Sequence, residues 1–288
     1  MKYAIITNPS SGKMTADQKR SALSKAAEVL EAEIHGLDTT SPSQFAQCAR
    51  ELASRCDVLV IAGGDGTFSD VINAIDTSQT TIAYLPMGSG NALRHVLKYK
   101  GDMVYMSVRI KMGKIHYFDL IECDGKKLSL SASIGIEGKV LELRERYRSK
   151  NVTGFSSYLK ALGGIYLRPY KRPAAQVIVD DNELYVPELF TLVVAKQPYY
   201  GYGMNVIPQA RPGDGRLHVL CLNCHFLKAL LGGITAFTIG NRVGLYQSGK
   251  QVRVKLDRPM LLQLDGNLAW EAKDFSFCVL PSALRIKY

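Results

Sequence analysis

The chain has 288 residues, with 36 Lys and Arg against 26 Asp and Glu and a formal net charge of +10. Apolar residues make up 47% and charged residues 22%, a globular composition that argues against extended disorder. No apolar run approaches the ~18 residues of a spanning helix, and the N-terminus lacks the features of a signal peptide. We therefore expect a cytoplasmic protein of one or two domains. The positive charge favours an anionic partner, namely a nucleotide, a nucleic acid or a membrane surface, although it also serves solubility.

The first hundred or so residues alternate between strands and helices. Short β-branched runs predict buried strands at Tyr3–Thr7, Val58–Ala62 and Thr81–Leu85. Apolar residues at helical spacing predict helices at Ala16–Ala32, at Ser43–Ser54, around Phe68–Ile75 and from Ala92 onward. The repeated order of strand, loop and helix predicts a parallel α/β domain over residues 1–117.

The pattern changes to one of short strands after residue 115. Strand-like runs lie at Phe118–Cys123, Lys127–Ser133, Ala175–Val179, Glu183–Val186, Glu188–Ala195, Arg216–Leu222, Gln251–Leu256, Met260–Leu264 and Phe275–Leu280. Helical stretches interrupt them near 137–166 and 226–238. This predicts an antiparallel, sandwich-like β domain over residues 118–280, and the tail 281–288 is free to rejoin the first domain.

One group of cysteines matches the motif for covalent haem attachment. Cys221-Leu-Asn-Cys224-His225 reads C-x-x-C-H, but haem attachment of that kind needs export, and no second C-x-x-C pair completes a zinc site. Cys221 also continues an apolar run. We expect buried free thiols there.

Two glycine-rich loops each follow a predicted strand and open a helix. They are Gly63–Thr67 and Gly88–Asn91. Ligands of parallel sheets bind beyond the C-terminal ends of the strands, where glycine and helix N-termini accept phosphate. A carboxylate there repels phosphate unless a cation intervenes, so Asp65 implies Mg²⁺ with a nucleotide or a place near the transferring group. Neither loop matches the Walker A motif or the dinucleotide-binding fingerprint. The alternative to phosphate binding is that the glycines only form tight turns.

Six motifs together resemble the diacylglycerol kinase catalytic family, which includes bacterial lipid kinases, sphingosine kinases and ceramide kinases. In chain order they are Asn8–Gly12, Gly63–Thr67, Pro86–Asn91, Ser131–Gly135, Pro212–Gly215 and Leu264–Gly266. The resemblance implies an N-terminal three-layer α/β domain similar to those of NAD kinase and phosphofructokinase. It also implies a C-terminal β domain that holds lipid, with ATP and Mg²⁺ as cofactors.

The resemblance further implies roles for individual residues. The nucleotide contacts would be Asn8, Ser11, Gly12, Thr40, Gly63, Gly64, Asp65, Gly66, Thr67, Gly88, Ser89 and Asn91. The family's structural Mg²⁺ site falls on the carboxylate of Asp214 and the main-chain carbonyls of Arg211 and Arg216. A plain Asp-Gly turn is the alternative for that loop.

The acceptor side departs from the family pattern. Where the family has Asp-Gly-Glu, this chain has Asp265-Gly266-Asn267. We expect Asp265 to orient and deprotonate the acceptor hydroxyl, while Asn267 can orient the hydroxyl but cannot take its proton. Because phosphoryl transfer depends mainly on positioning, an active kinase and a lapsed one both fit.

The expected lipid-binding turn also departs from the sphingosine kinases. It begins at Gly135, and Lys139 stands where those enzymes carry Asp. Lysine would repel a sphingoid amine, which favours a neutral or acidic lipid such as diacylglycerol; the alternative is a lysine that faces solvent.

A basic and aromatic stretch suits an anionic bilayer interface. Its members are Arg144, Arg146, Tyr147, Arg148, Lys150, Phe155, Tyr158, Tyr166, Arg168, Tyr170, Lys171 and Arg172. A solvated helical face is the alternative, and no nucleic-acid-binding motif is present.

The combined expectation is an ATP- and Mg²⁺-dependent lipid kinase of phospholipid metabolism that associates peripherally with membranes. A homodimer is left open. The alternatives are an NAD-kinase-like enzyme and a lipid- or nucleotide-binding module that has lost catalysis.

Overall fold

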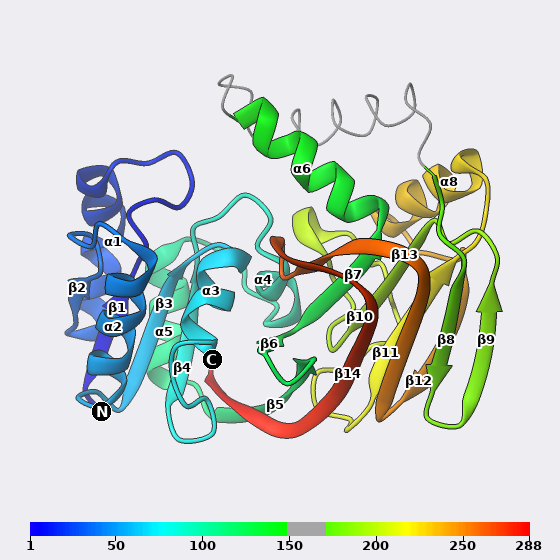
Figure 1. The fold of residues 1–288 in the computed structure, drawn as a ribbon. Helices are drawn as coiled ribbons and strands as arrows, with labels where there is room; N and C mark the ends of the chain where they lie inside the picture. The colour runs from blue at the N-terminus through cyan, green and yellow to red at the C-terminus, as the bar shows by residue number, and fades with distance from the viewer. Residues whose placement is uncertain (149–170) are drawn as a thin grey trace. The chain divides into compact units, whose positions relative to one another are not determined.

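The computed structural model describes residues 1–148 and 171–288 (Figure 1). The chain divides into two compact units. The first contains Met1–Leu120, Gly201–Gly203 and Pro281–Tyr288, and the second contains Ile121–Tyr200 and Met204–Leu280. Two strands, β5 (Ile115–Cys123) and β14 (Asn267–Lys287), contribute residues to both units.

The first unit is built on a parallel sheet. Its strand order is β2-β1-β3-β4, with bounds β1 (Tyr3–Ile6), β2 (Glu33–His35), β3 (Val58–Gly63) and β4 (Thr81–Pro86). The end of β14 extends the sheet by pairing in parallel with β4. Every residue of β3 and β4 is buried, as expected where helices cover both faces of a parallel sheet.

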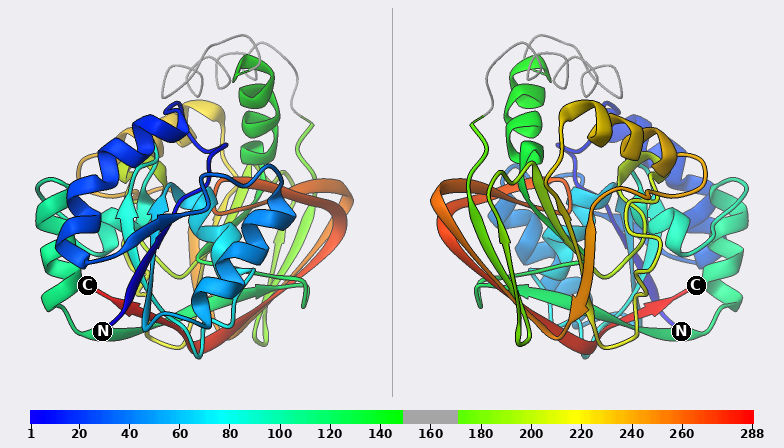
Figure 2. Two further views of the ribbon diagram at one scale, coloured as in Figure 1. Left: turned by 90° about the vertical axis from the view of Figure 1, so that its left-hand side faces the viewer. Right: turned by 90° about the vertical axis from the view of Figure 1, so that its right-hand side faces the viewer.

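Helices cover the two faces of this sheet. On one side α1 (Ala16–Leu30) packs with α5 (Met103–Met112), and on the other α2 (Pro42–Ala53) packs with α3 (Asp65–Ile72), as the left view of Figure 2 shows. A short helix, α4 (Ala92–Val96), follows β4. Local sequence explains where the longer helices begin: Thr15 and Gln18 form a capping box on α1, and Ser41 caps α2 with Pro42 at its first position.

The second unit is mainly antiparallel. Its strands follow the order β12-β11-β10-β7-β13-β14, with the β8–β9 hairpin paired to β13 and β6 paired to β5. The bounds are β6 (Lys127–Ser129), β7 (Ser131–Gly135), β8 (Ala175–Val179), β9 (Asn182–Val186), β10 (Thr191–Ala195), β11 (Leu217–Leu222), β12 (Leu245–Gly249) and β13 (Gln251–Leu264). The α/β and sandwich-like β classes expected from the sequence are therefore both confirmed.

Two apolar clusters form the core of the second unit. The larger is made by inward residues of the β strands, from Ile121 to Phe277. The smaller lies beneath α6 (Ile136–Arg148) and α8 (Phe226–Ala236), and includes Val140 and Ile207. Among the described residues, no helix is long and apolar enough to cross a membrane.

The structure corrects several element boundaries. The run Lys127–Ser133 is two strands, whereas Gln251–Leu264 is a single strand with register shifts. The strands β2 and β12, the helix α5 and the one-turn 3₁₀ helix at Gly201–Gly203 were not anticipated. The expected helix near 137–166 is described only as far as residue 148. All six cysteines are free; Cys221 is buried, which raises its pKa to about 12, and Cys224 is half-buried.

Candidate functional site

The parallel sheet brings four loops of the first unit to one edge. Strands β1, β2, β3 and β4 run in the same direction, so the segments that follow them share the carboxyl edge of the sheet. Ligands of such sheets bind at that edge. The structure thus brings together the Asn8–Gly12 segment, the loop before α2 and the two glycine-rich loops. The candidate nucleotide contacts lie in these four segments.

The two glycine-rich loops touch through their backbones. A Cβ added to Gly88 would lie 2.4 Å from the Cα of Gly64 and 2.9 Å from Asn91 Oδ1. A Cβ added to Gly63 would lie 2.6 Å from the Cβ of Thr67. Real Cβ atoms do not approach so closely, so glycine is required here by contact. The result is a pair of loops whose main chains are held against each other.

Asp65 lies at the start of α3 with its carboxylate turned towards the second loop. Its Oδ1 accepts a hydrogen bond from the Ala92 main-chain N–H at 2.8 Å, and a Cβ on Gly90 would lie 2.8 Å from its Oδ2. Burial raises the pKa of Asp65 to about 6, and hydrogen bonds from main-chain N–H groups such as that of Ala92 oppose this rise. The carboxylate therefore links the two loops, and its desolvation makes ionisation costly.

Asn91 and Thr67 have different surroundings. Asn91 takes a left-handed backbone, φ 49°, and its side-chain amide bonds to its own loop, with Oδ1 accepting from Gly88 N at 2.9 Å and Nδ2 donating to Gly88 O at 2.6 Å. Thr67 is buried, and its hydroxyl has no hydrogen-bond partner among the described residues. Asn91 therefore shapes its loop, whereas the Thr67 hydroxyl is available to an acceptor such as a phosphate oxygen. Ser89 is exposed at the tip of the second loop.

A buried lysine fixes the Asn8–Gly12 segment. Lys19, on α1, is 3% exposed, and its ammonium donates to the carbonyls of Asn8 at 2.6 Å and Pro9 at 2.9 Å and to Ser11 Oγ at 3.3 Å. Burial lowers the pKa of Lys19. The Ser11 hydroxyl donates back to the Asn8 carbonyl at 2.8 Å. Sequence patterns do not indicate this role, because Lys19 has the position of an ordinary polar residue of an amphipathic helix.

Thr40 is exposed and bonds locally. Its main-chain N–H and its hydroxyl both lie 2.8 Å from Gln44 Oε1. It contacts none of the glycine-rich loops through a described hydrogen bond, so its suggested role as a nucleotide contact rests on the resemblance alone.

In the second unit, Asp265 organises the junction of β6 and β7. Its carboxylate accepts hydrogen bonds from Ser131 N at 2.8 Å, Ser131 Oγ at 3.1 Å and Leu130 N at 3.2 Å. Asp265 itself is buried with φ 46°, at the turn between β13 and β14. Its oxygens thus accept hydrogen bonds from main-chain N–H groups that lie 134 or more residues earlier in the sequence. Asn267, two residues on, is exposed and pairs with Leu264 at the start of β14.

Glu137 is a titratable residue that the sequence did not single out. It lies in the first turn of α6, and Thr191 Oγ1 donates a short hydrogen bond to its Oε2. Burial raises the pKa of Glu137 to about 7, against the opposing effect of the Thr191 hydrogen bond. Gly135, with φ 125°, has no room for a Cβ beside the Phe190 carbonyl, and Lys139 is exposed. The basic and aromatic stretch at 144–172 lies outside the described side chains except for Lys171 and Arg172.

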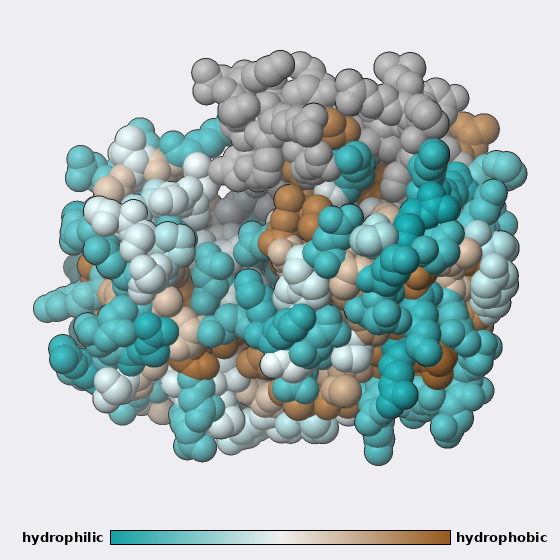
Figure 3. All heavy atoms as spheres, in the orientation of Figure 1, coloured by the Kyte–Doolittle hydropathy of each residue, from teal (hydrophilic) through white to brown (hydrophobic). Residues whose placement is uncertain are grey.

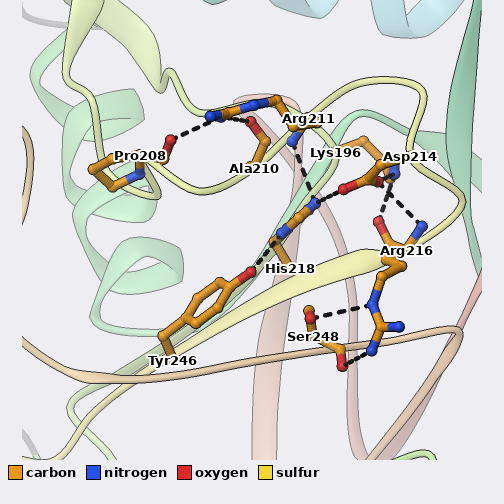
Figure 4. Close-up of polar contacts among 9 residues, drawn as sticks. All are labelled: Lys196, Pro208, Ala210, Arg211, Asp214, Arg216, His218, Tyr246 and Ser248. Carbon is orange, nitrogen blue, oxygen red and sulfur yellow. Dashed lines mark hydrogen bonds and ion pairs between the residues drawn. The ribbon is translucent and has the colours of Figure 1, made fainter.

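The Asp214 loop holds a charge network rather than open oxygens (Figure 4). Lys196 Nζ donates to Asp214 Oδ1 at 2.7 Å and to the Arg216 carbonyl, and His218 Nε2 lies 2.9 Å from Asp214 Oδ2. Burial acts to raise the pKa of Asp214, but the hydrogen bond and charge of Lys196 hold it below its ordinary value. Within the described residues no cluster of three or more His, Cys, Asp or Glu could hold a metal. Two of the three oxygens suggested for Mg²⁺, Asp214 Oδ1 and the Arg216 carbonyl, thus accept hydrogen bonds from the Lys196 ammonium.

Comparison with known proteins matches both units. Residues 2–123 match the diacylglycerol kinase catalytic domain, and residues 131–288, more than half of the chain, match the YegS C-terminal NAD kinase β-sandwich-like domain. A diacylglycerol kinase of Bacillus subtilis is 24% identical over 270 residues, which cover 91% of this chain and 88% of the relative.

Solved structures show the same fold. A diacylglycerol kinase of Bacillus anthracis covers 100% of this chain and 96% of its own, at 15% identity and a TM-score of 0.71. An NAD kinase of Archaeoglobus fulgidus, solved with ATP, covers 100% of this chain and 94% of its own, at 13% identity and a TM-score of 0.56. The resemblance read from the six motifs is thus confirmed, and the chain belongs to the diacylglycerol kinase catalytic-domain family.

Proposed function

We propose that this chain transfers the γ-phosphoryl group of ATP to a hydroxyl of a lipid, with diacylglycerol or a related lipid alcohol as acceptor. The observation that carries the proposal is the pair of glycine-rich loops in direct backbone contact, with the desolvated carboxylate of Asp65 bonded across them. Such loops leave main-chain N–H groups for phosphate oxygens, and the unpartnered hydroxyl of Thr67 adds a donor. ATP enters as its magnesium complex, which offsets the charge of a carboxylate among phosphates.

The reaction exchanges one P–O bond for another. The acceptor oxygen forms a bond to the γ-phosphorus, the bond to the β-phosphate oxygen breaks so that ADP leaves, and the hydroxyl proton passes to water. Because the transition state is loose, positioning and charge neutralisation contribute most of the rate. In this proposal the glycine-rich loops hold the phosphates and Asp265 helps to position the acceptor. Its carboxylate fixes Ser131 and Leu130, and this favours an orienting role over proton removal.

The first test is lipid phosphorylation by an Asp65 variant. Purified protein is given labelled ATP and diacylglycerol in mixed micelles, and the product is identified by chromatography. Asp65→Ala is expected to lose transfer, whereas Asp38→Ala, a change at a carboxylate whose side chain is 96% exposed, is expected to keep it. Unchanged turnover in Asp65→Ala would sink the assignment.

Two other functions are separated by the same assay. The NAD kinase fold of the Archaeoglobus neighbour favours NAD as an alternative acceptor, and label appearing in NAD rather than in lipid would select it. The exposed Asn267 in place of the family's Glu favours a binding module without catalysis. Binding of ATP and lipid with no transfer over a broad lipid panel would select that reading.

A further inference from the structure

A fully buried ammonium lies where the family resemblance implies a divalent cation. Lys196 follows β10 directly, and its side chain is 0% exposed. Its Nζ donates to Asp214 Oδ1 and to the carbonyl of Arg216 (Figure 4). These are two of the three oxygens that the implied Mg²⁺ site would use. The ammonium therefore already occupies two of the oxygens that a cation would need.

The remaining oxygen of the carboxylate is also engaged. His218 Nε2 lies 2.9 Å from Asp214 Oδ2, and His218 Nδ1 lies 2.9 Å from the Tyr246 hydroxyl. The Arg211 main-chain N–H donates to His218 Nε2 at 3.2 Å, so this ring nitrogen lies between the Arg211 main chain and the Asp214 carboxylate. Mg²⁺ needs nearly octahedral oxygen ligands at about 2.0–2.1 Å. A second cation placed on Asp214 would have to displace the ammonium or lie against it.

We propose that Lys196 replaces the divalent cation in this chain. Its ammonium neutralises Asp214 and ties the loop at 211–216 to the end of β10, so the fold of this loop does not depend on Mg²⁺. A buried lysine is stable only with such a partner, which explains why Asp214 and the Arg216 carbonyl both face it. The proposal concerns this loop alone and leaves the magnesium that accompanies ATP untouched.

The test compares Mg²⁺ with a chelator in the absence of nucleotide. The thermal midpoint of the wild-type protein is expected to be the same in both. Lys196→Gln removes the charge, frees Asp214 and the Arg216 carbonyl, and is expected to lower the midpoint in chelator and to regain roughly 5 °C or more in saturating Mg²⁺. The double variant Lys196→Gln/Asp214→Asn is expected to lose that gain. Arg258→Gln, which breaks an exposed ion pair elsewhere in the unit, is a matched control with no Mg²⁺ effect.

Binding of Mn²⁺, followed by electron paramagnetic resonance, covers the case in which Lys196→Gln does not fold. Nucleotide-free wild-type protein and the Asp214→Asn variant are expected to bind the same amount of Mn²⁺, because Asp214 holds no ion in the wild type. Wild-type protein that binds such an ion, or that is stabilised by Mg²⁺ through Asp214, would overturn the proposal. A folded Lys196→Gln variant whose thermal midpoint does not change with Mg²⁺ would also overturn it, because Lys196 would then only form an ion pair with Asp214 and would not replace a cation.

An independent observation concerns helix α8, whose amphipathic pattern is inverted. Leu227, Leu230, Leu231 and Ile234 lie three or four residues apart on one face and are between 45% and 71% exposed. On the opposite side Ala229 packs on the smaller apolar cluster, and Ala236 is buried. Hydrophobic atoms show at the upper right of Figure 3, the region that α8 occupies in Figure 1.

The stretch of sequence that contains this apolar face carries charge of one sign. Residues 215–256 contain no Asp or Glu, and they carry six cations. Lys228 and Arg242, on and just after α8, are exposed. Phe237 and Ile239 extend the exposed apolar surface beyond the end of the helix. An apolar helix face in a stretch of sequence whose charged residues are all cationic suits the interface of an anionic bilayer.

We infer that α8 docks this chain on anionic membranes, an inference that rests on the proposed lipid kinase function. The four exposed aliphatic side chains enter the acyl boundary, while Lys228 and Arg242 stay among the headgroups. This surface is formed by described residues.

Vesicle flotation tests the inference without catalysis. Wild-type protein is expected to bind phosphatidylglycerol vesicles more tightly than phosphatidylcholine vesicles, with a loss of affinity at high salt. Leu230→Ser/Ile234→Ser is expected to weaken binding at least roughly tenfold. Tyr185→Ser, at a side chain that is 66% exposed on β9, is the matched control and is expected to bind normally. Phosphorylation of a short-chain, dispersed acceptor is expected to be unchanged in both variants.

Each alternative has its own outcome. Equal vesicle binding by wild type and the α8 variant would overturn the inference. A dimer in sedimentation that the α8 variant abolishes, with unchanged vesicle binding, would assign the face to a second copy of the chain instead. Wild-type protein that does not phosphorylate the dispersed acceptor would contradict the proposed function. The vesicle result would still decide whether α8 binds membranes.

Discussion

The carboxylate of Asp65 should reduce stability at neutral pH, and Asp65→Asn should relieve that cost. Burial raises the pKa of Asp65 from 3.8 to about 6. The folded protein therefore holds this proton more tightly than the unfolded chain does, and stability falls as pH rises between these values. At 1.36 kcal/mol for each pKa unit, the full cost above pH 6 is about 3 kcal/mol. About 2 kcal/mol of it accrues between pH 4.5 and 7.5.

The assay is urea unfolding of nucleotide-free protein at pH 4.5 and pH 7.5, followed by circular dichroism. Asparagine keeps an oxygen for the Ala92 N–H but has no proton to lose. The difference in unfolding free energy between Asp65→Asn and wild type should therefore increase by about 2 kcal/mol from the lower to the higher pH. Other titratable groups contribute equally to both proteins and cancel in that difference. Asp38→Asn, at an exposed side chain, is the control, and its difference from wild type in unfolding free energy is expected to be the same at both pH values. Asp65→Asn should also lose phosphate transfer, so the variant gains stability as it loses activity.

A pH-independent difference between Asp65→Asn and wild type would show that the Asp65 carboxylate does not reduce stability at neutral pH. So would a variant that is less stable than wild type at pH 7.5. Either result would mean that Asp65 is better solvated, or better hydrogen-bonded, than its position between the two loops indicates.

Four further changes test other parts of the molecule. Glu137→Gln should raise stability at pH 8 by up to about 3 kcal/mol and much less at pH 5, measured by urea unfolding, because burial raises the pKa of Glu137 to about 7. Gly88→Ala should cost about 1–3 kcal/mol of unfolding free energy and weaken ATP binding in calorimetry, because its Cβ would overlap the opposing loop. Lys19→Met should cost a similar amount and also weaken ATP binding, because the carbonyls of the Asn8–Gly12 segment lose their donor. Asn267→Glu should raise kcat by up to ~100-fold in the lipid assay if the carboxylate takes the acceptor proton, and an unchanged kcat would exclude that role.

The phosphate loops could be predicted because their signal is local. Gly63–Thr67 and Gly88–Asn91 each follow a buried apolar run and precede a helical one, and the parallel sheet then brings them to one edge. The register that makes Gly64 touch Gly88 is not visible in the sequence, although the glycines that permit it are.

The buried charges could not be predicted, because their partners are distant in sequence. Lys196 and Asp214 are 18 residues apart, and Asp265 and Ser131 are 134 apart. No periodicity links such pairs, and only the strand pairing of the second unit brings them within hydrogen-bonding distance. Asp265 accordingly appeared in the sequence as a free base beside the acceptor, whereas in the structure its oxygens bind the main chain of Leu130 and Ser131.

Some helices and strands were missed because their sequences are short or carry a mixed pattern. The strand β2 has three residues, and none of them is buried. The helix α5 packs through Met106 and Ile110 but leaves Val108 and Met112 exposed, so its apolar stripe is indistinct. The helix α8 was predicted near 226–238, but its composition does not say which of its faces meets solvent.

The lipid kinase function is best examined by phosphate transfer from labelled ATP into a total lipid extract. We expect label to enter a lipid with a free hydroxyl, the product to be its phosphomonoester, and Asp65→Ala to produce none. Label that enters NAD and no lipid, or label that enters lipid equally well with Asp65→Ala, would show that the chain is not a lipid kinase of this kind.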